Sequence, residues 1–273
     1  MSRDPAHSGS PRVPTDEEVA ELEKAFGTWY GEGDAEAALG ILVTLAPELL
    51  ERWTIEARIR SDLGEVEAAE VALGRARALG GNDELEVLVA VGVVSLAAWR
   101  LDEAREAFER VAQEEADAWL LERLSVLADL DGDFELADRL LAAAHELEPE
   151  SAPLPPRLAP EEFETLVDEA ARDLPDEFRL HLDEVAVVID PMPSGPMEQP
   201  PELLGLFVGI PLGERESGAS GELPPTIYLY QRNLERVVLT REELRREIRI
   251  TLYHELGHFL GFDEHGVEEM GLG

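Results

Sequence analysis

The sequence predicts a multidomain protein in which an all-α array of helical repeats is followed by a small α+β domain. Three observations predict this fold class. A short break in the helical pattern recurs at residues 33, 64, 99 and 132, which lie 31, 35 and 33 residues apart. A stretch with five prolines in thirteen residues, 148–160, then ends the repeats. Beyond it, short runs of β-branched and aromatic residues predict strands.

The four breaks read "GDAEAA", "GEVEAA", "WRLDEA" and "GDFELA", and aligning them gives columns of shared chemistry. The third place after each break is acidic, the fifth is alanine and the ninth is large and apolar. An alanine lets two helices approach closely, and the large residue one turn later fills the resulting groove. The columns hold Glu36, Glu67, Asp102 and Glu135, then Ala38, Ala69, Ala104 and Ala137, then Leu42, Leu73, Phe108 and Leu141.

A period near 34 residues with these positions resembles tetratricopeptide repeats. The last copy matches best, because Ala144 and Pro149 fall where that family places its second alanine and its proline. The resemblance implies a curved solenoid whose concave face binds peptides or proteins. We therefore expect a protein or peptide partner for these tetratricopeptide-like repeats.

Four parts of the chain are expected: a disordered tail, the repeats, a proline-rich linker and the α+β domain, at residues 1–15, 16–148, 149–159 and 160–273. Within the α+β domain we expect a helix that ends before Pro175, and then strands at residues 185–189, 203–210 and 226–230. A long helix then begins at a capping box formed by Thr240 and Glu243, and Gly261 is expected to end it.

The composition narrows the possible partners and chemistry. The net charge of −37, from 60 acidic and 23 basic residues, disfavours binding to nucleic acid or to an anionic membrane. The absence of cysteine excludes disulfides, thiolate zinc sites and cysteine nucleophiles. No stretch is apolar and long enough for a membrane span, and the first residues lack the apolar core of a signal peptide, so we expect a cytoplasmic protein.

The expected last helix carries "HELGH" at residues 254–258. His254 and His258 are four residues apart and share one face of the helix, so both imidazoles can point one nitrogen at a common zinc ion. Glu255 lies one residue around the helix and can reach a water held on that metal. The zinc lowers the pKa of this water towards about 7, and Glu255 accepts its proton as the water attacks a carbonyl.

Catalytic zinc normally has three protein ligands and one open position. The nearby candidates for the third ligand follow Gly261. Glu264 is favoured, because it is the third residue after that glycine and completes the pattern HExxHxxGxxE. His265 and Asp263 stay open as alternatives.

Residues 160–273 resemble a family of minimal zincin-like metallopeptidases, through "FETLVDEAARDLPDEF", "LLGLFVGIPL", "LPPTIYLYQRNLER", "TREELRREIRITLYHELGH" and "LGFDEH". The resemblance implies a compact core with the motif helix packed against a small sheet. The family pattern is HExxHxxGxxD, with the aspartate as the third ligand. Its two histidines and glutamate correspond to His254, His258 and Glu255. Its aspartate corresponds to Glu264, which keeps the charge on an arm one methylene longer.

We therefore expect a zinc-dependent metallopeptidase, with Glu255 as general base and the repeats recruiting a substrate or a partner protein. The first alternative is an interaction protein whose zincin domain is inactive or only binds metal. A second alternative is a hydrolase of a non-peptide amide.

Further expectations concern the strand "TIYLY", residues 226–230, and the arginines around the motif helix. The strand is either an edge strand beside which a peptide substrate lies or an ordinary sheet strand. Tyr228 or Tyr230 either polarises a carbonyl or packs in the core. Salt bridges to acidic repeat residues, with substrate binding as the alternative, are expected for Arg232, Arg241, Arg245, Arg246 and Arg249.

Overall fold

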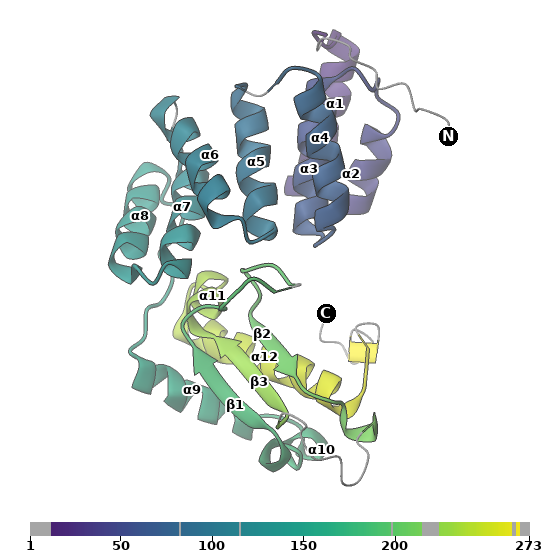
Figure 1. Cartoon of the computed structure of the whole chain (residues 1–273). Helices are drawn as coiled ribbons and strands as arrows, with labels where there is room; N and C mark the ends of the chain where they lie inside the picture. The colour runs from purple at the N-terminus through teal and green to yellow at the C-terminus, as the bar shows by residue number, and fades with distance from the viewer. Residues whose placement is uncertain are drawn as a thin grey trace. The chain divides into compact units, whose positions relative to one another are not determined.

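The computed structural model describes residues 12–81, 83–114, 116–197, 199–214, 224–263 and 266–267. Within these residues the chain is mostly helical, with twelve α-helices and one three-stranded sheet near its C-terminal end (Figure 1). The predicted fold class is confirmed.

The chain divides into two compact units. The helical unit comprises the residues up to Leu127 together with Gly195–Pro201, and the α+β unit comprises Ala128–Ser194 and the residues from Glu202 onward. The domain bounds expected from the sequence stay a prediction. Residues 1–11 of the expected tail lie outside the described residues.

Eight helices precede the proline-rich stretch in the described chain: α1 Asp16–Tyr30, α2 Ala35–Leu42, α3 Leu50–Asp62, α4 Val66–Ala78, α5 Leu85–Ala97, α6 Leu101–Glu114, α7 Ala118–Leu130 and α8 Phe134–Leu147. In the helical unit, α1 packs on α2, α3 on α4 and α5 on α6, while α3 also packs on α5. This pairing is consistent with the predicted helix-turn-helix repeats.

The four break positions share one backbone conformation. Gly33, Gly64 and Gly132 have φ angles of 74°, 72° and 78°, and Trp99 has a φ of 59°. Trp99 is the only residue other than glycine with a positive φ in the described chain. All four alanines of the alanine column are fully buried, and the large apolar residues after them are buried too. The break positions therefore mark a repeated turn. The alanine and large apolar columns mark a repeated contact between helices.

The α+β unit continues with α9 Pro160–Arg172, α10 Asp176–Arg179, β1 Ala186–Asp190, β2 Gly205–Val208, β3 Thr226–Tyr230, α11 Gln231–Arg236 and α12 Arg241–Leu260. The strand order is β1-β3-β2, with β1 parallel and β2 antiparallel to β3. The strand "TIYLY" is therefore central, so of the two alternatives expected for it the ordinary sheet strand is correct and the edge strand is wrong. Because β3 pairs with β1 over residues 226–230 and with β2 over residues 226–229, β1 and β2 are the outer strands of the described sheet.

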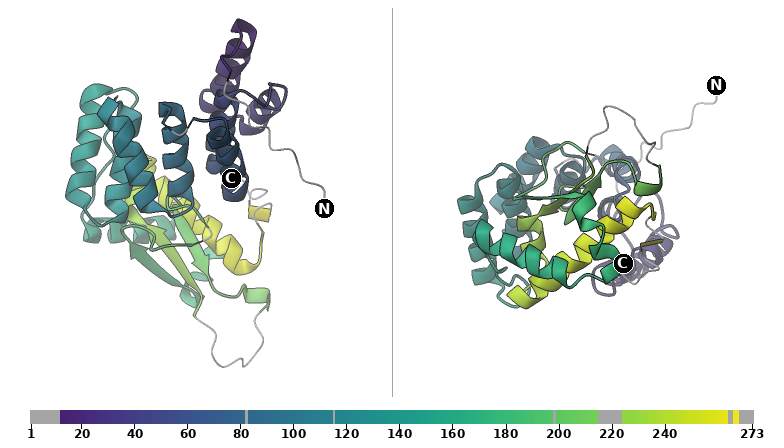
Figure 2. Two further views of the ribbon diagram at one scale, coloured as in Figure 1. Left: turned by 45° about the horizontal axis from the view of Figure 1, so that its top comes forward. Right: turned by 90° about the horizontal axis from the view of Figure 1, so that it is seen from below.

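Helices α9 and α12 lie side by side against the sheet (Figures 1 and 2). Ile227 and Leu229 of β3 point into their shared core and are fully buried. Helix α9 contributes Phe163, and α12 contributes Leu256 and Phe259. Burying large apolar side chains from three elements in one cluster stabilises the position of α12 on the sheet.

Both predicted ends of α12 are confirmed. Thr240 accepts a hydrogen bond from the Glu243 backbone N–H, and the Glu243 carboxylate accepts one from the Thr240 N–H. At the other end Gly261 has a φ of 99°, a left-handed conformation that favours glycine. These caps set the last two turns of α12, which carry the "HELGH" motif.

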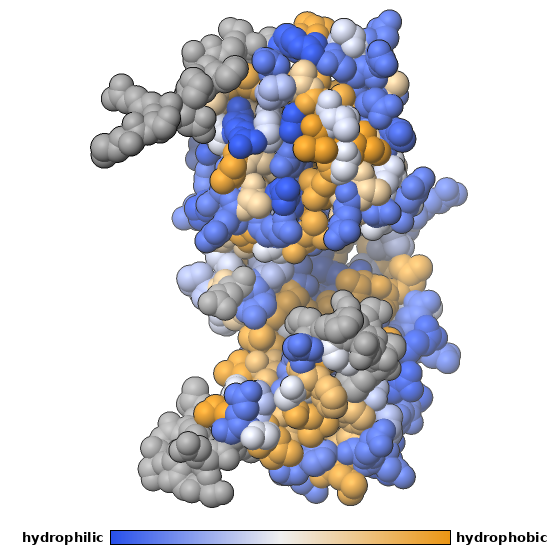
Figure 3. All heavy atoms as spheres, turned by 90° about the vertical axis from the view of Figure 1, so that its right-hand side faces the viewer, coloured by the Kyte–Doolittle hydropathy of each residue, from blue (hydrophilic) through white to orange (hydrophobic). Residues whose placement is uncertain are grey.

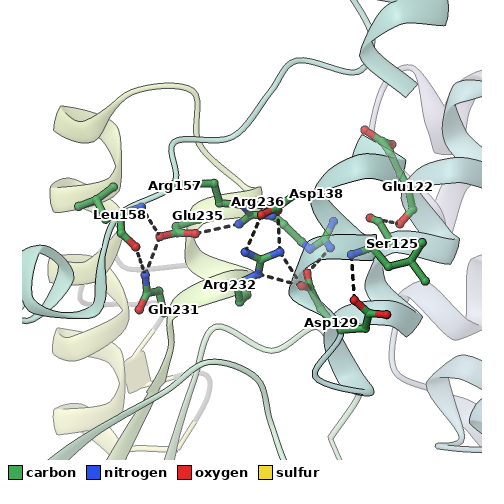
Figure 4. Close-up of polar contacts among 12 residues, drawn as sticks. Glu122, Ser125, Asp129, Asp138, Arg157, Leu158, Gln231, Arg232, Glu235 and Arg236 are labelled. Atoms are coloured by element: carbon green, nitrogen blue, oxygen red, sulfur yellow. Dashed lines mark hydrogen bonds and ion pairs between the residues drawn. The ribbon is translucent and has the colours of Figure 1, made fainter. Parts of the chain in front are cut away.

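A buried ion-pair cluster fixes α11 within the same unit (Figure 4). Arg232 donates to Asp129 and to Asp138, with N–O distances of 2.6 and 2.7 Å. Arg236 pairs with Asp129 as well. The expectation that Arg232 pairs with acidic residues of the predicted repeat region is therefore confirmed, whereas Arg245 pairs with Asp173 near the end of α9 instead.

Candidate metal centre

His254 and His258 converge at the C-terminal end of α12. Their Nε2 atoms are 3.0 Å apart, and the two ring planes are nearly perpendicular at 79°. Two nitrogen ligands at 2.0–2.1 Å from a tetrahedral zinc ion are about 3.3 Å apart. The observed separation is close to that value, so the two imidazoles fit a shared metal ion.

A backbone contact orients the ring of His258. Its Nδ1 lies 3.0 Å from the carbonyl oxygen of Phe262. A carbonyl can only accept, so Nδ1 is the donor in this contact, which leaves Nε2 facing His254. Histidines that ligate a metal commonly donate their other ring N–H in this way. The left-handed Gly261 turns the chain so that the Phe262 carbonyl reaches back to this ring.

Glu255 is buried, with 7% of its surface exposed. Its Oε2 accepts a hydrogen bond of 2.7 Å from the backbone N–H of Phe207 in the outer strand β2. The bond holds the carboxylate of α12 against the edge of the sheet. No sequence pattern indicates this role of Phe207, because the contact joins residues 48 positions apart.

Gly205 allows β2 to approach α12 closely. A Cβ at this position would lie 2.6 Å from Cγ2 of Thr251 and 3.2 Å from Cγ of Glu255. The first distance is shorter than real Cβ contacts, so a side chain at residue 205 would separate the strand from the helix.

Tyr230 lies near Glu255 at the end of β3 and is almost fully buried. Burial, followed by the charges of Asp190, Tyr228 and Glu255, raises the pKa of the Tyr230 hydroxyl to about 12. The phenol therefore stays protonated at neutral pH. The rings of Tyr228 and Tyr230 stack with centroids 6.4 Å apart, which agrees with the expected packing role.

The third ligand stays open. Glu264, the favoured residue, and His265 lie outside the described residues. Asp263 is exposed, and its Oδ1 accepts a hydrogen bond of 2.9 Å from the Gly266 backbone N–H. Within the part of the chain that the structure describes, no three potential ligands come together. The assignment of His254, His258 and Glu264 as ligands and of Glu255 as base stays a prediction.

The geometry can be compared with known families. Residues 182–273 match the zincin-like metallopeptidase family. The matched range contains the whole sheet, α11, α12 and the histidine pair, so the zincin resemblance predicted from the sequence is confirmed over this range. No curated protein matches the chain. None of the helices in the described residues is long and apolar enough to cross a membrane.

Proposed function

We propose that the protein is a zinc-dependent metallopeptidase whose helical repeats recruit a substrate or a partner protein. The observation that carries this proposal is the convergence of the two Nε2 atoms 3.0 Å apart, with the His258 Nδ1 proton directed away from them. The match of residues 182–273 to zincin-like metallopeptidases supports the same reaction class.

His254, His258 and Glu264 would hold the metal. Zinc, when bound, supplies a Lewis acid that lowers the pKa of a water towards about 7. Glu255 takes the proton of the attacking water and delivers it to the leaving amine. The Phe207 N–H holds the Glu255 carboxylate in one orientation. A general base needs such a fixed position because it must lie within hydrogen-bond reach of the proton that it takes.

The outer strand β2 suggests how a peptide would bind. An extended peptide that lies along an outer strand places its carbonyl groups at regular intervals beside that strand. Because Phe207 of β2 contacts Glu255 directly, a peptide along β2 would pass the proposed base. In this proposal β2, and not β3, is the edge strand along which the peptide lies.

The substitution Glu255→Gln tests this function. It removes the base and keeps the size of the side chain, so we expect cleavage of a proteome-derived peptide library to fall by about 10²–10⁴-fold. Zinc content and thermal unfolding should stay unchanged. Glu242→Gln is the control, since Glu242 is exposed in the first turn of the same helix. Equal cleavage by wild type and Glu255→Gln would contradict the proposal.

The second candidate, an interaction protein with a non-catalytic zincin unit, is favoured by a cavity in the helical unit that is described below. It predicts that Glu255→Gln changes no cellular phenotype, whereas substitutions in that cavity do. The two candidates are therefore separated by the same pair of variants.

A further inference from the structure

The helical unit contains a cavity of about 460 Å³ between α1, α3 and α5. Its apolar wall includes Leu22 and Phe26 of α1 and Ile55 of α3. Its charged wall includes Glu51, Arg58 and Glu86. None of these residues belongs to the candidate metal centre.

The cavity follows from the spacing of residues along α3. Glu51, Ile55 and Arg58 stand at positions i, i+4 and i+7, so they lie on one face of that helix. Leu22 and Phe26 have the same four-residue spacing on α1. The two helices thus present an apolar strip. On α3, the acidic Glu51 lies towards one end of this strip and the basic Arg58 lies two turns away.

Two carboxylates of the cavity, those of Glu51 and Glu86, form no salt bridge among the described residues, although the charge of Arg12 acts on Glu51. Oε2 of Glu51 is buried and has no hydrogen-bond partner. Partial desolvation, and then the charges of Glu51 and Glu84, raise the pKa of Glu86, whose side chain is exposed to solvent. The nearby cation Arg12 is paired with Glu18. Neighbouring carboxylates that form no salt bridge of their own favour a ligand that brings a positive charge.

Arg58 offers hydrogen-bond donors at the other end. Its guanidinium lies over the rings of Phe26, Trp29 and Trp119, at 5.6, 5.1 and 5.4 Å from their centroids. Its Nε is buried without a hydrogen-bond partner in the described structure. Burial lowers the pKa of this side chain although Asp62 and Asp117 act in the opposite direction. A buried donor without an acceptor is costly, and a ligand carbonyl would satisfy it.

We propose that this cavity binds a peptide segment of a partner protein in which a basic side chain stands next to a bulky apolar one. The basic group meets Glu51 and Glu86, and the apolar group packs on Leu22, Phe26 and Ile55. A backbone carbonyl of the peptide accepts from Arg58. The net charge of −37 attracts such a partner at long range.

Apolar surface alone does not identify this site. Figure 3 shows apolar residues (orange) mixed with polar ones (blue) on the visible face, as on most proteins. The unpaired charges beside the apolar wall distinguish the cavity and decide the chemistry of its occupant. The proposal rests on the recruiting role of the repeats and is independent of zinc binding.

Fluorescence polarisation with the full-length protein tests the proposal. The probes are two labelled nonapeptide pools with random flanks, one with Leu-Arg at the centre and one with Leu-Glu. We expect the Leu-Arg pool to bind at least about tenfold more tightly, and this preference to fall as salt rises. Equal binding of the two pools, or binding of neither, would overturn the proposal.

Charge reversal separates loss of the site from loss of the fold. We expect the double variant Glu51→Lys, Glu86→Lys to prefer the Leu-Glu pool, a gain that an unfolded protein cannot give. Glu36→Lys, Glu67→Lys is the matched control, because both residues are exposed and outside the cavity. A preference for Leu-Arg that survives the cavity double variant would contradict the assignment.

A segment of the chain itself is the competing occupant, since Pro14 lines the cavity and precedes α1. Deletion of residues 1–11 distinguishes it. If peptide binding appears only after this deletion, the cavity serves the chain's own N-terminal segment and the proposal is wrong. Failure of Glu255→Gln to affect cleavage would concern the metal centre alone and leave this proposal standing.

Discussion

At the scale of single residues, the candidate metal centre depends on backbone positions as much as on ionisable groups. The sequence identified His254, Glu255 and His258 through their spacing on a helix, because that spacing alone places them on adjacent faces. It did not identify the carbonyl of Phe262 or the N–H of Phe207, which orient His258 and Glu255. Backbone groups are present at every residue, so no residue type could reveal these contacts.

Gly205→Ala tests the close approach of β2 to α12. The added methyl would meet Cγ2 of Thr251 at 2.6 Å, so the strand must shift. We expect a loss of about 1–3 kcal/mol in the free energy of unfolding and a larger loss of cleavage, because Phe207 moves with the strand. Urea unfolding measures the first effect.

Gly213→Ala is the control for this experiment, since a Cβ at residue 213 meets nothing within 4 Å. If Gly205→Ala unfolds at the same urea concentration as wild type and cleaves peptides normally, the close packing has no role in positioning Glu255.

At the scale of elements, the strands at residues 226–230 and 185–189 were predicted to within one residue. Their β-branched and aromatic residues are typical of strands. The order β1-β3-β2 could not be predicted, since each strand is short and apolar enough for either place. Helices α10 and α11, of four and six residues, are too short to show a helical period.

The turn before α6 gives a prediction at the same scale. Trp99 has a left-handed backbone conformation, and the residue at the equivalent break position of the other three repeats is glycine. It also donates a hydrogen bond of 2.9 Å from Nε1 to the carbonyl of Gln199. Both Trp99→Gly and Trp99→Ala lose this contact, but only alanine keeps the backbone strain. We expect the glycine variant to be more stable by about 1 kcal/mol, measured by urea unfolding.

Val71 supplies the comparison, because it is exposed in the middle of α4. There the order should reverse, with Val71→Ala more stable than Val71→Gly by about 1 kcal/mol. The same order at both positions would show that Trp99 carries no strain.

The ion-pair cluster around α11 predicts a pH dependence (Figure 4). Burial alone would raise the pKa of Asp138, but the hydrogen bond and charge of Arg232, with the charge of Arg157, lower it overall. A carboxyl with a lowered pKa in the folded state stabilises the fold above its unfolded pKa of about 4, and the contribution is lost as the pH falls through the folded value. We expect Asp138→Asn to destabilise the protein at pH 7.

The difference between Asp138→Asn and wild type should shrink as the pH falls below about 4. Guanidinium unfolding at a series of pH values measures it. Glu135→Gln is the control, since Glu135 is exposed on the same helix. A difference that stays constant down to the lowest pH would mean that the charge of Asp138 is not what stabilises the cluster.

At the scale of the whole molecule, the sequence predicted a helical part and an α+β part because periodicity changes at the proline-rich stretch. It could not predict that Gly195–Pro201 packs in the helical unit. The contact responsible joins Trp99 to Gln199, which are 100 residues apart. The strongly acidic composition disfavoured nucleic acid and anionic membranes as partners, but net charge alone does not indicate where a protein partner binds.

The central claim is that His254 and His258 hold a metal ion together with Glu264. Mass spectrometry of the purified protein for bound metal, beside His258→Ala, Glu264→Ala and Glu255→Gln, tests it most directly. We predict about one zinc ion per chain in the wild type and in Glu255→Gln, and almost none in the other two variants. No zinc in the wild type after zinc is added back, or zinc retained by His258→Ala, would contradict the claim.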